Sequence, residues 1–170
     1  DGKVFCLVFH AGDDLEELLK KAYTTFFLEN GLNPSAFPSL RRLETEVVAM
    51  TAHLLGGDDQ VVGNMTTGGT ESILLAVKAA RDYYRSIRPE ITAPEMILPT
   101  TAHAAFHKAG HYLDVNVVRV AVDPTTFRAD PAAIEAAITP NTILLVGSAP
   151  SYSHGVVDPI TDLGRIALDH

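Results

Sequence analysis

Apolar residues recur at three- and four-residue intervals over the first third of the chain, which predicts two amphipathic helices, about 13–31 and 39–55. A loop with two prolines separates them, and Ser39 can cap the second helix. The two predicted apolar faces comprise Leu15, Leu18, Leu19, Ala22, Phe26 and Phe27, and then Leu40, Leu43, Val47, Met50, Leu54 and Leu55. Residues 1–57 are therefore expected to form a helical N-terminal segment.

From residue 58 onward the pattern changes to short apolar strands that alternate with helices. Such alternation predicts an α/β fold, with a mostly parallel sheet and helices on both faces. The alternation stops at His170 inside a predicted helix, so we expect residues 58–170 to be the first part of an incomplete larger domain. The expected strands are 96–99, 117–122 and 143–146, and the expected helices are 70–85, one opening near 103, 130–138 and 162–168.

Composition and charge limit the partners. Hydrophobic residues make up 46% of the chain and charged residues 20%, as in an ordinary globular domain. The net charge is −8, and no basic cluster occurs beyond Arg41-Arg42, which argues against nucleic acid and anionic membrane surfaces as partners. Apolar runs such as Ile143 to Val146 are too short for a membrane span. A single cysteine, Cys6, allows no disulfide framework, so we expect a reducing, cytoplasmic location.

The segment Asn64 to Ser72 has two adjacent glycines, Gly68 and Gly69, where the chain enters a predicted helix. Glycine lets the backbone approach a ligand, and the first amides of a helix carry partial positive charge that suits phosphate. Thr67 and Thr70 add hydroxyl donors. The pattern is neither a Walker loop nor Gly-x-Gly-x-x-Gly. A small phosphorylated ligand and a plain glycine turn with a threonine cap both remain open.

Three histidines, His103, His107 and His111, lie four residues apart. On one helix they would share a face and could bind a metal, although Asp114 is the only nearby carboxylate that could complete a site. A structural or solvated role is the favoured interpretation for His107 and His111, and no metal is expected. His103 follows a predicted strand, at the sheet edge where α/β proteins bind ligands, and its imidazole could stack on an aromatic ring.

A second polar loop, from Ser148 to Gly155, follows the predicted strand 143–146. Its hydroxyls, the Tyr152 phenol and the His154 imidazole suit the orientation of a polar ligand or the movement of a proton. A loop without chemistry is the alternative interpretation. Asp158-Pro159 reads as a turn before the last helix.

Three blocks in this order resemble sphingosine-1-phosphate lyases and, more distantly, the group II pyridoxal-phosphate (PLP) decarboxylases of amino acids. They are Thr67–Ile73, Ala102–Ala109 and Ser153–Pro159, and the resemblance runs from about Gly2 to His170. It implies the large domain of a fold-type I PLP enzyme, of the aspartate-aminotransferase-like class. The expected function is a PLP-dependent aldehyde-lyase acting on an amine or amino acid. An amino-acid carboxy-lyase and a non-catalytic or metal-binding relative are the alternatives.

The resemblance also implies roles for individual residues. Gly68, Gly69 and Thr70 would hold the PLP phosphate, and His103 would stack on the pyridine ring. Ser151 or Tyr152 would lie near the ring's 3-oxygen or the substrate, with Tyr152 able to move a proton. The family builds its site across a homodimer, so Asn33 and the loop after it are expected to bind substrate in the partner's site.

The chain departs from the family pattern in two respects. The family's Schiff-base lysine and the aspartate that pairs with the pyridine nitrogen would both lie beyond His170, and Lys78 and Lys108 do not match the lysine motif. The chain alone is therefore expected to be inactive. The family's Asn-Pro-Leu-His segment is replaced by Asn33 to Pro38, which has no histidine to hold a substrate phosphate. This difference favours an amine or amino acid other than sphingosine 1-phosphate.

Overall fold

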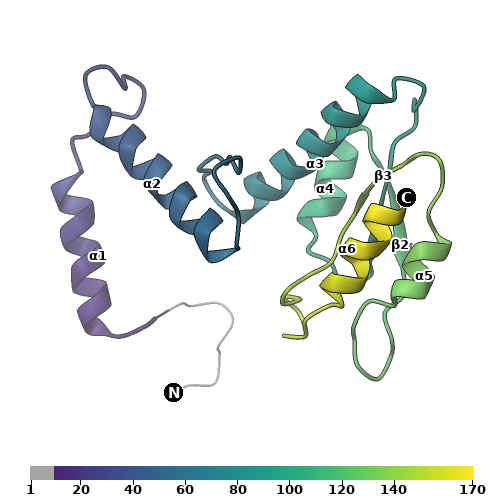
Figure 1. Ribbon diagram of the computed structural model, residues 1–170. Coiled ribbons are helices and arrows are strands. Elements are labelled where there is room, and N and C mark those ends of the chain that lie inside the picture. The colour runs from purple at the N-terminus through teal and green to yellow at the C-terminus, as the bar shows by residue number, and fades with distance from the viewer. Residues whose placement is uncertain (1–9) are drawn as a thin grey trace. The chain divides into compact units, whose positions relative to one another are not determined.

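The computed structural model describes residues 10–170, which form two compact units, one ending at Met65 and the other beginning at Thr66. Each unit is described by itself (Figure 1). Cys6 and the start of the segment that resembles the lyases lie outside the described residues.

The first unit contains two helices, α1 (Asp13–Thr25) and α2 (Pro38–Leu54). Acidic residues in the first turn of α1 complement the positive end of the helix dipole. Helix α2 starts one residue earlier than predicted. Pro38 occupies its first turn, where a missing N–H and a fixed φ are favourable, so the prediction that Ser39 caps the helix was wrong. Within residues 10–65, neither helix buries a residue.

The second unit is built on a parallel sheet of three strands in the order β2-β1-β3. The strands are β1 (Glu95–Pro99), β2 (Asn116–Val120) and β3 (Thr142–Leu145). Each lies within a residue or two of its predicted position, because apolar and β-branched runs favour buried strands. The expectation of a parallel sheet is confirmed.

Helices cover both faces of this sheet (Figure 1). On one face, Met96 and Leu98 of β1 pack with Val77 of α3 (Gly69–Ile87) and Ala109 of α4 (Ala105–Leu113). On the other face, β1 presents Ile97. That side chain packs in a second core with residues of α5 (Pro131–Ala136) and α6 (Ile160–Asp169). The alternation of strand side chains thus produces two cores, and the predicted arrangement of helices is confirmed.

The connections place the starts of several helices at one edge of the sheet. The end of α3 is tied to the beginning of β3, because Arg88 Nη2 donates to the carbonyl of Pro140 at 3.3 Å. Helix α3 therefore begins near the opposite edge, where the parallel strands end. Helices α4 and α6 also begin there, since each follows a strand. Open α/β sheets bind their ligands at this carboxyl edge.

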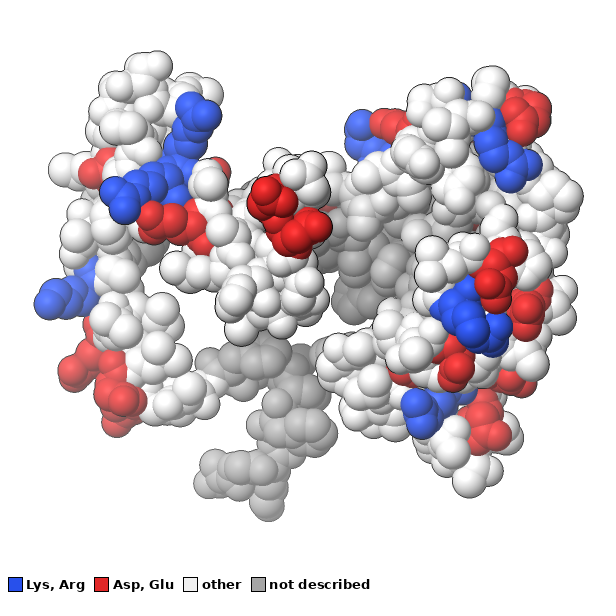
Figure 2. Space-filling model, viewed as in Figure 1, with Lys and Arg blue, Asp and Glu red and all other residues white. Residues whose placement is uncertain are grey.

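Charged side chains of both signs are interspersed on the visible face of each unit (Figure 2). Several form ion pairs one helical turn apart, as Lys78 does with Asp82 at 2.6 Å and Arg165 with Asp169 at 3.2 Å. Exposed pairs of this kind contribute little to stability. None of the described helices is both long enough and apolar enough to cross a bilayer.

Candidate functional site

The turn into α3 leaves a set of backbone amides free at the helix N-terminus. Gly68 adopts φ 159° and ψ 174°, a conformation that is essentially restricted to glycine. The first helical hydrogen bond runs from the Ser72 N–H to the Gly68 carbonyl at 3.1 Å. Among residues 10–170, the N–H groups of Gly69, Thr70 and Glu71 have no acceptor. An anion bound here would accept hydrogen bonds from these three donors and would lie at the positive end of the helix dipole.

Glu71 fixes the geometry of this turn. Its Oε2 accepts hydrogen bonds from the Thr67 N–H and from the Thr67 hydroxyl, both at 2.6 Å. Thr66 Oγ1 adds a bond of 2.7 Å to Ser72 Oγ. The Thr67 hydroxyl, predicted to serve a ligand, therefore serves the turn itself. Sequence reasoning missed Glu71, although an acidic residue at the third helical position commonly bonds back to the preceding turn.

We expect the turn at Thr67 to loosen in acid. The hydroxyl and then the N–H of Thr67 hold the pKa of Glu71 below its ordinary value of 4.5. A lowered pKa in the folded state means that this contribution to stability is complete above pH 4.5 and is lost as pH falls through the lowered pKa. In Thr67→Val, the Glu71 pKa should move back toward 4.5, as followed by carboxyl chemical shifts. An unchanged pKa in the valine variant would contradict the assignment.

His103 lies between β1 and α4 and acts as a cap for the helix. Its Nδ1 accepts a hydrogen bond from the Ala105 N–H at 3.1 Å, so a neutral ring carries its proton on Nε2. The helix starts at Ala105, close to the predicted opening near 103, and the bond to His103 satisfies one of its N-terminal amides. Nearby, Thr101 has the one buried side-chain oxygen in residues 10–170 that lacks a hydrogen-bond partner.

The three histidines do not form a common surface. His107 and His111 lie on α4, whereas His103 precedes it, so the spacing of four does not put all three on one helical face. No group of three or more His, Cys, Asp or Glu side chains in residues 10–170 is arranged to hold a metal. The metal-binding interpretation therefore has no site in the described structure.

Tyr152 and His103 come together across the edge of the sheet. Their ring centroids lie 6.3 Å apart at an interplanar angle of 72°, an edge-to-face arrangement. The side chain of Tyr152 is 66% exposed, whereas Ser151 is 1% exposed. Ser151 closes a turn, since its N–H donates to the Val156 carbonyl at 2.7 Å and its own carbonyl accepts from Gly155 at 2.8 Å. Of the two candidates in this loop, Tyr152 is the one that a ligand can reach.

A buried carboxylate joins the two loops next to the site. Asp158 is 1% exposed. Its Oδ1 accepts from the Ala129 N–H and its Oδ2 from the Ser148 N–H, both at 2.8 Å. It thereby ties the loop after β2 to the loop after β3. The sequence predicted only a turn at Asp158-Pro159. The signal that could have indicated a buried acceptor is an acidic residue directly after the apolar pair Val156-Val157.

Asn33 belongs to the first unit, whereas the other candidates belong to the second. Its Oδ1 accepts a hydrogen bond from the Ala36 N–H at 3.3 Å and stabilises the loop before α2. In the second unit, the starts of α3 and α4 and the loop after β3 share one sheet edge. The roles assigned to Gly68, Gly69, Thr70, His103, Ser151, Tyr152 and Asn33 stay predictions.

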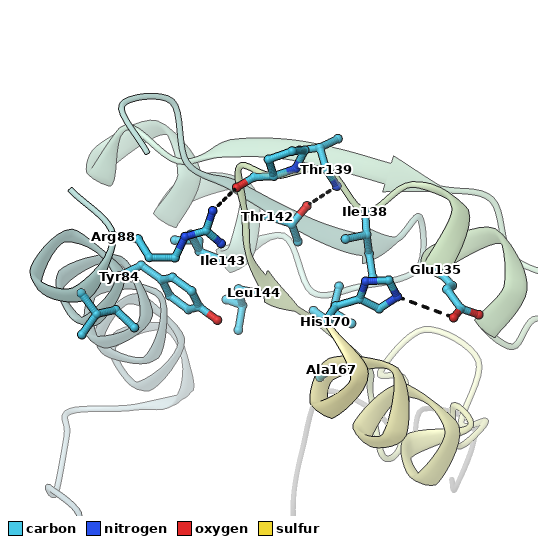
Figure 3. Close-up of a pocket in the computed structure, with 13 residues that line it drawn as sticks. Tyr84, Arg88, Glu135, Ile138, Thr139, Thr142, Ile143, Leu144, Ala167 and His170 are labelled. Carbon is cyan, nitrogen blue, oxygen red and sulfur yellow. Dashed lines mark hydrogen bonds and ion pairs between the residues drawn. The ribbon is translucent and has the colours of Figure 1, made fainter. Parts of the chain in front are cut away.

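A cavity of about 620 Å³ lies elsewhere, beside the side of β3 that no described strand pairs with (Figure 3). Arg88, Glu135 and His170 project around it, and His170 Nε2 lies 3.7 Å from Glu135 Oε1. The lining includes Thr142 at the amino end of β3 and no candidate residue. The candidate site lies at the carboxyl ends of the strands and is therefore separate from this cavity.

The second unit has a parallel α/β sheet with a free helix N-terminus and two polar loops at the carboxyl ends of its strands, the arrangement at which α/β domains commonly bind small anionic ligands. The DegT/DnrJ/EryC1/StrS aminotransferase family matches residues 27–170, and the chain belongs to this family. The resemblance to sphingosine-1-phosphate lyases is also confirmed. The chain is 44% identical to that of Dictyostelium discoideum over its whole length, and 48% identical to that of Oryza sativa over 98% of its length.

The chain spans about a third of the length of these relatives, 32% in both cases. A sphingosine-1-phosphate lyase structure from Burkholderia pseudomallei matches 95% of the chain and 39% of its own, with a TM-score of 0.87 and 38% identity. The glutamate decarboxylase of Lactobacillus brevis, at 17% identity and a TM-score of 0.74, matches 99% of the chain and 46% of its own, and shows the fold alone. The expected fold-type I class is confirmed.

Proposed function

We propose that these residues form the phosphate-binding and ring-binding part of a PLP-dependent carbon–carbon lyase that acts on a phosphorylated long-chain amino alcohol. The observation that carries the proposal is the free helix N-terminus at Gly69, at the same sheet edge as the His103–Tyr152 pair. The names of the similar proteins support an aldehyde-lyase in preference to a carboxy-lyase. They also favour sphingosine 1-phosphate as the substrate, against the expectation drawn from the missing histidine in Asn33 to Pro38.

The residues at this edge fit the cofactor. A Cβ atom added at Gly68 or at Gly69 would meet no atom within 4 Å, so the space in front of the α3 N-terminus is open. Three amides without acceptors border that space. A phosphate dianion needs donors of this kind and favours the positive end of a helix dipole. We assign Gly68, Gly69 and Thr70 to the phosphate.

His103 and Tyr152 are assigned to the ring and the substrate. The Ala105 N–H holds His103 Nδ1, which fixes the plane of the imidazole that we propose stacks on the pyridine ring. Bound PLP supplies an electron sink for the bond that breaks. Tyr152 is exposed, so its phenol can donate a proton to carbon and its phenolate form can accept one from a substrate hydroxyl. Ser151, the other candidate near the ring's 3-oxygen, supports Tyr152 by closing the turn beneath it.

The test uses the whole protein that carries these residues. With PLP it should be yellow, lose that absorbance with a carbonyl-trapping reagent, and release a long-chain aldehyde from sphingosine 1-phosphate. Tyr152→Phe keeps the ring and removes the proton carrier, so kcat should fall by roughly 10²–10⁴. A colourless protein would overturn the cofactor assignment, and release of carbon dioxide from an amino acid with no aldehyde would favour a carboxy-lyase.

We also propose that the first unit packs against a second copy and brings Asn33 to the partner's site. The support is the set of large exposed apolar side chains on its two helices, because exposed apolar surface of this kind can mark an interaction site. Sedimentation of the whole protein tests this, and a monomer at micromolar concentration would count against it. The exposed apolar side chains of α1 and α2 are Leu15, Leu18, Leu19, Tyr23, Leu43, Val47, Met50 and Leu54.

The predicted cytoplasmic location stays a prediction.

A further inference from the structure

A tight turn after β2 holds Phe127 in a left-handed backbone conformation. Oδ1 of Asp123 accepts hydrogen bonds from the N–H groups of Thr125 at 2.9 Å and Thr126 at 2.6 Å. The Phe127 N–H then donates to the Asp123 carbonyl at 2.8 Å. The φ of Phe127 is 58°, which a bulky residue rarely adopts, so the surrounding bonds must maintain it.

The ring of Phe127 stacks on the imidazole of His154. The ring centroids lie 4.6 Å apart, with 15° between the planes. On its other side, His154 Nδ1 lies 2.8 Å from Ser153 Oγ. Phe127 is 42% exposed and belongs to neither core cluster. The left-handed conformation of Phe127 therefore places its ring against His154 and not in a core.

His154 and Tyr152 belong to the same short turn. The base of this turn is closed by the enclosed Ser151, which bonds across the turn to Gly155 and Val156. The tip of the turn carries both His154, whose ring stacks on Phe127, and the exposed Tyr152, whose ring lies edge-on to His103.

Asp158 fixes the bases of both loops but not their tips. Its two bonds hold Ala129, at the end of the loop after β2, and Ser148, at the start of the loop after β3. The only ring–ring contact between the tips of these loops, within residues 10–170, is that of Phe127 with His154. Backbone bonds thus close the turn that carries Tyr152 at its base, and the contact with Phe127 holds its tip against the other loop.

We propose that Phe127 is a positioning residue for Tyr152 and acts through His154. The inference rests on the proposed function, in which the Tyr152 phenol moves a proton. Loss of the Phe127 ring frees the His154 end of the turn, so the phenol spends less time in the productive orientation. Proton transfer is sensitive to small displacements of the group that carries the proton.

Phe127→Gly separates this role from a structural one. Glycine adopts a φ of 58° without strain, so the variant should melt at the same temperature as the parent protein or higher. The kcat of the lyase reaction should nevertheless fall roughly ten- to a hundredfold, while KM stays within about twofold. Phe127→Tyr keeps the stacked ring and should restore kcat. Phe127→Asn, which also tolerates this conformation, should repeat the loss.

A double-mutant cycle tests whether Phe127 acts through His154. In a His154→Ala background, the added change Phe127→Gly should cause no further loss of kcat, because the contact is already gone. Hydrogen exchange in residues 150–156 should also be about tenfold faster in Phe127→Gly than in Phe127→Tyr. Exchange in α4 serves as the control and should be equal in both variants.

Several results would overturn the proposal: an unchanged kcat in Phe127→Gly, an additive loss in the double variant, or a loss that accompanies a lower melting temperature in all three Phe127 variants. If the parent protein has no lyase activity, the proposed function fails, and the exchange experiment alone decides the positioning role. Faster exchange of residues 150–156 in Phe127→Gly but not in Phe127→Tyr then supports it, and equal exchange refutes it.

Discussion

Replacing Asp158 by alanine is expected to lower the free energy of unfolding of the whole protein by about 3 kcal/mol, because one buried and one half-buried backbone N–H group lose their acceptor. The carboxylate is 1% exposed, so water cannot easily replace it. The groups affected are the amides of Ala129 and Ser148, which belong to different loops. Denaturant unfolding measures the total loss, and hydrogen exchange at the two amides shows whether it is local.

Asp130 provides a matched control for this change. It also accepts from two backbone amides, those of Ala132 at 3.0 Å and Ala133 at 3.4 Å, but it is an exposed helix cap. Asp130→Ala should therefore cost only about 1 kcal/mol. Asp158→Asn keeps one acceptor oxygen and should fall between the two alanine variants. Equal losses at positions 130 and 158 would show that burial does not strengthen the Asp158 bonds.

Local features of the sequence were sufficient for most of the second unit. Asp130 and Pro131 predict a cap and a first helical position, and the structure has both. The apolar run from Ile143 to Val146 predicts a strand within one residue of β3. These signals work because each depends on neighbours a few residues away, and local preference agrees with the overall fold.

Features that depend on distant residues were not predictable in the same way. Asp158 bonds to Ala129, which is 29 residues away, and the sequence around it indicates only a turn. Phe127 stacks on His154 from another loop, and nothing local marks either residue as a partner. The His103 ring accepts a hydrogen bond from the first amide of α4, a contact that periodicity does not detect. Each case needs the tertiary arrangement that brings the loops to one edge.

The glycine turn was predicted as a site, but its internal bonds were not. The pair Gly68-Gly69 before an apolar helix is a local signal, whereas the bonds of Glu71 to Thr67 compete with any ligand for the donors of the turn. As a result, the ligand is left with the backbone amides of Gly69, Thr70 and Glu71 and with no hydroxyl from Thr67. Gly68 provides the backbone conformation of the turn and Gly69 provides a free amide, so substitutions at the two positions should have different effects.

Gly69→Ala is expected to weaken the binding of PLP to the whole protein by roughly ten- to 150-fold, because a methyl group would stand between the phosphate and the amides. This range corresponds to the loss of one charge-assisted hydrogen bond, on the order of 1.5–3 kcal/mol. The fold should tolerate the change, since the added Cβ would meet no atom within 4 Å and alanine favours a helix. Absorbance titration of the cofactor-free protein with PLP measures the affinity.

Two other glycines make this result specific. Gly164 of α6 also has nothing within 4 Å of an added Cβ, so Gly164→Ala should raise stability slightly and leave PLP binding unchanged. Gly68 adopts φ 159°, so Gly68→Ala should lower both stability and affinity through backbone strain. If Gly69→Ala binds PLP as tightly as Gly164→Ala does, the phosphate does not rest on the amides at the start of α3, and the cofactor assignment fails.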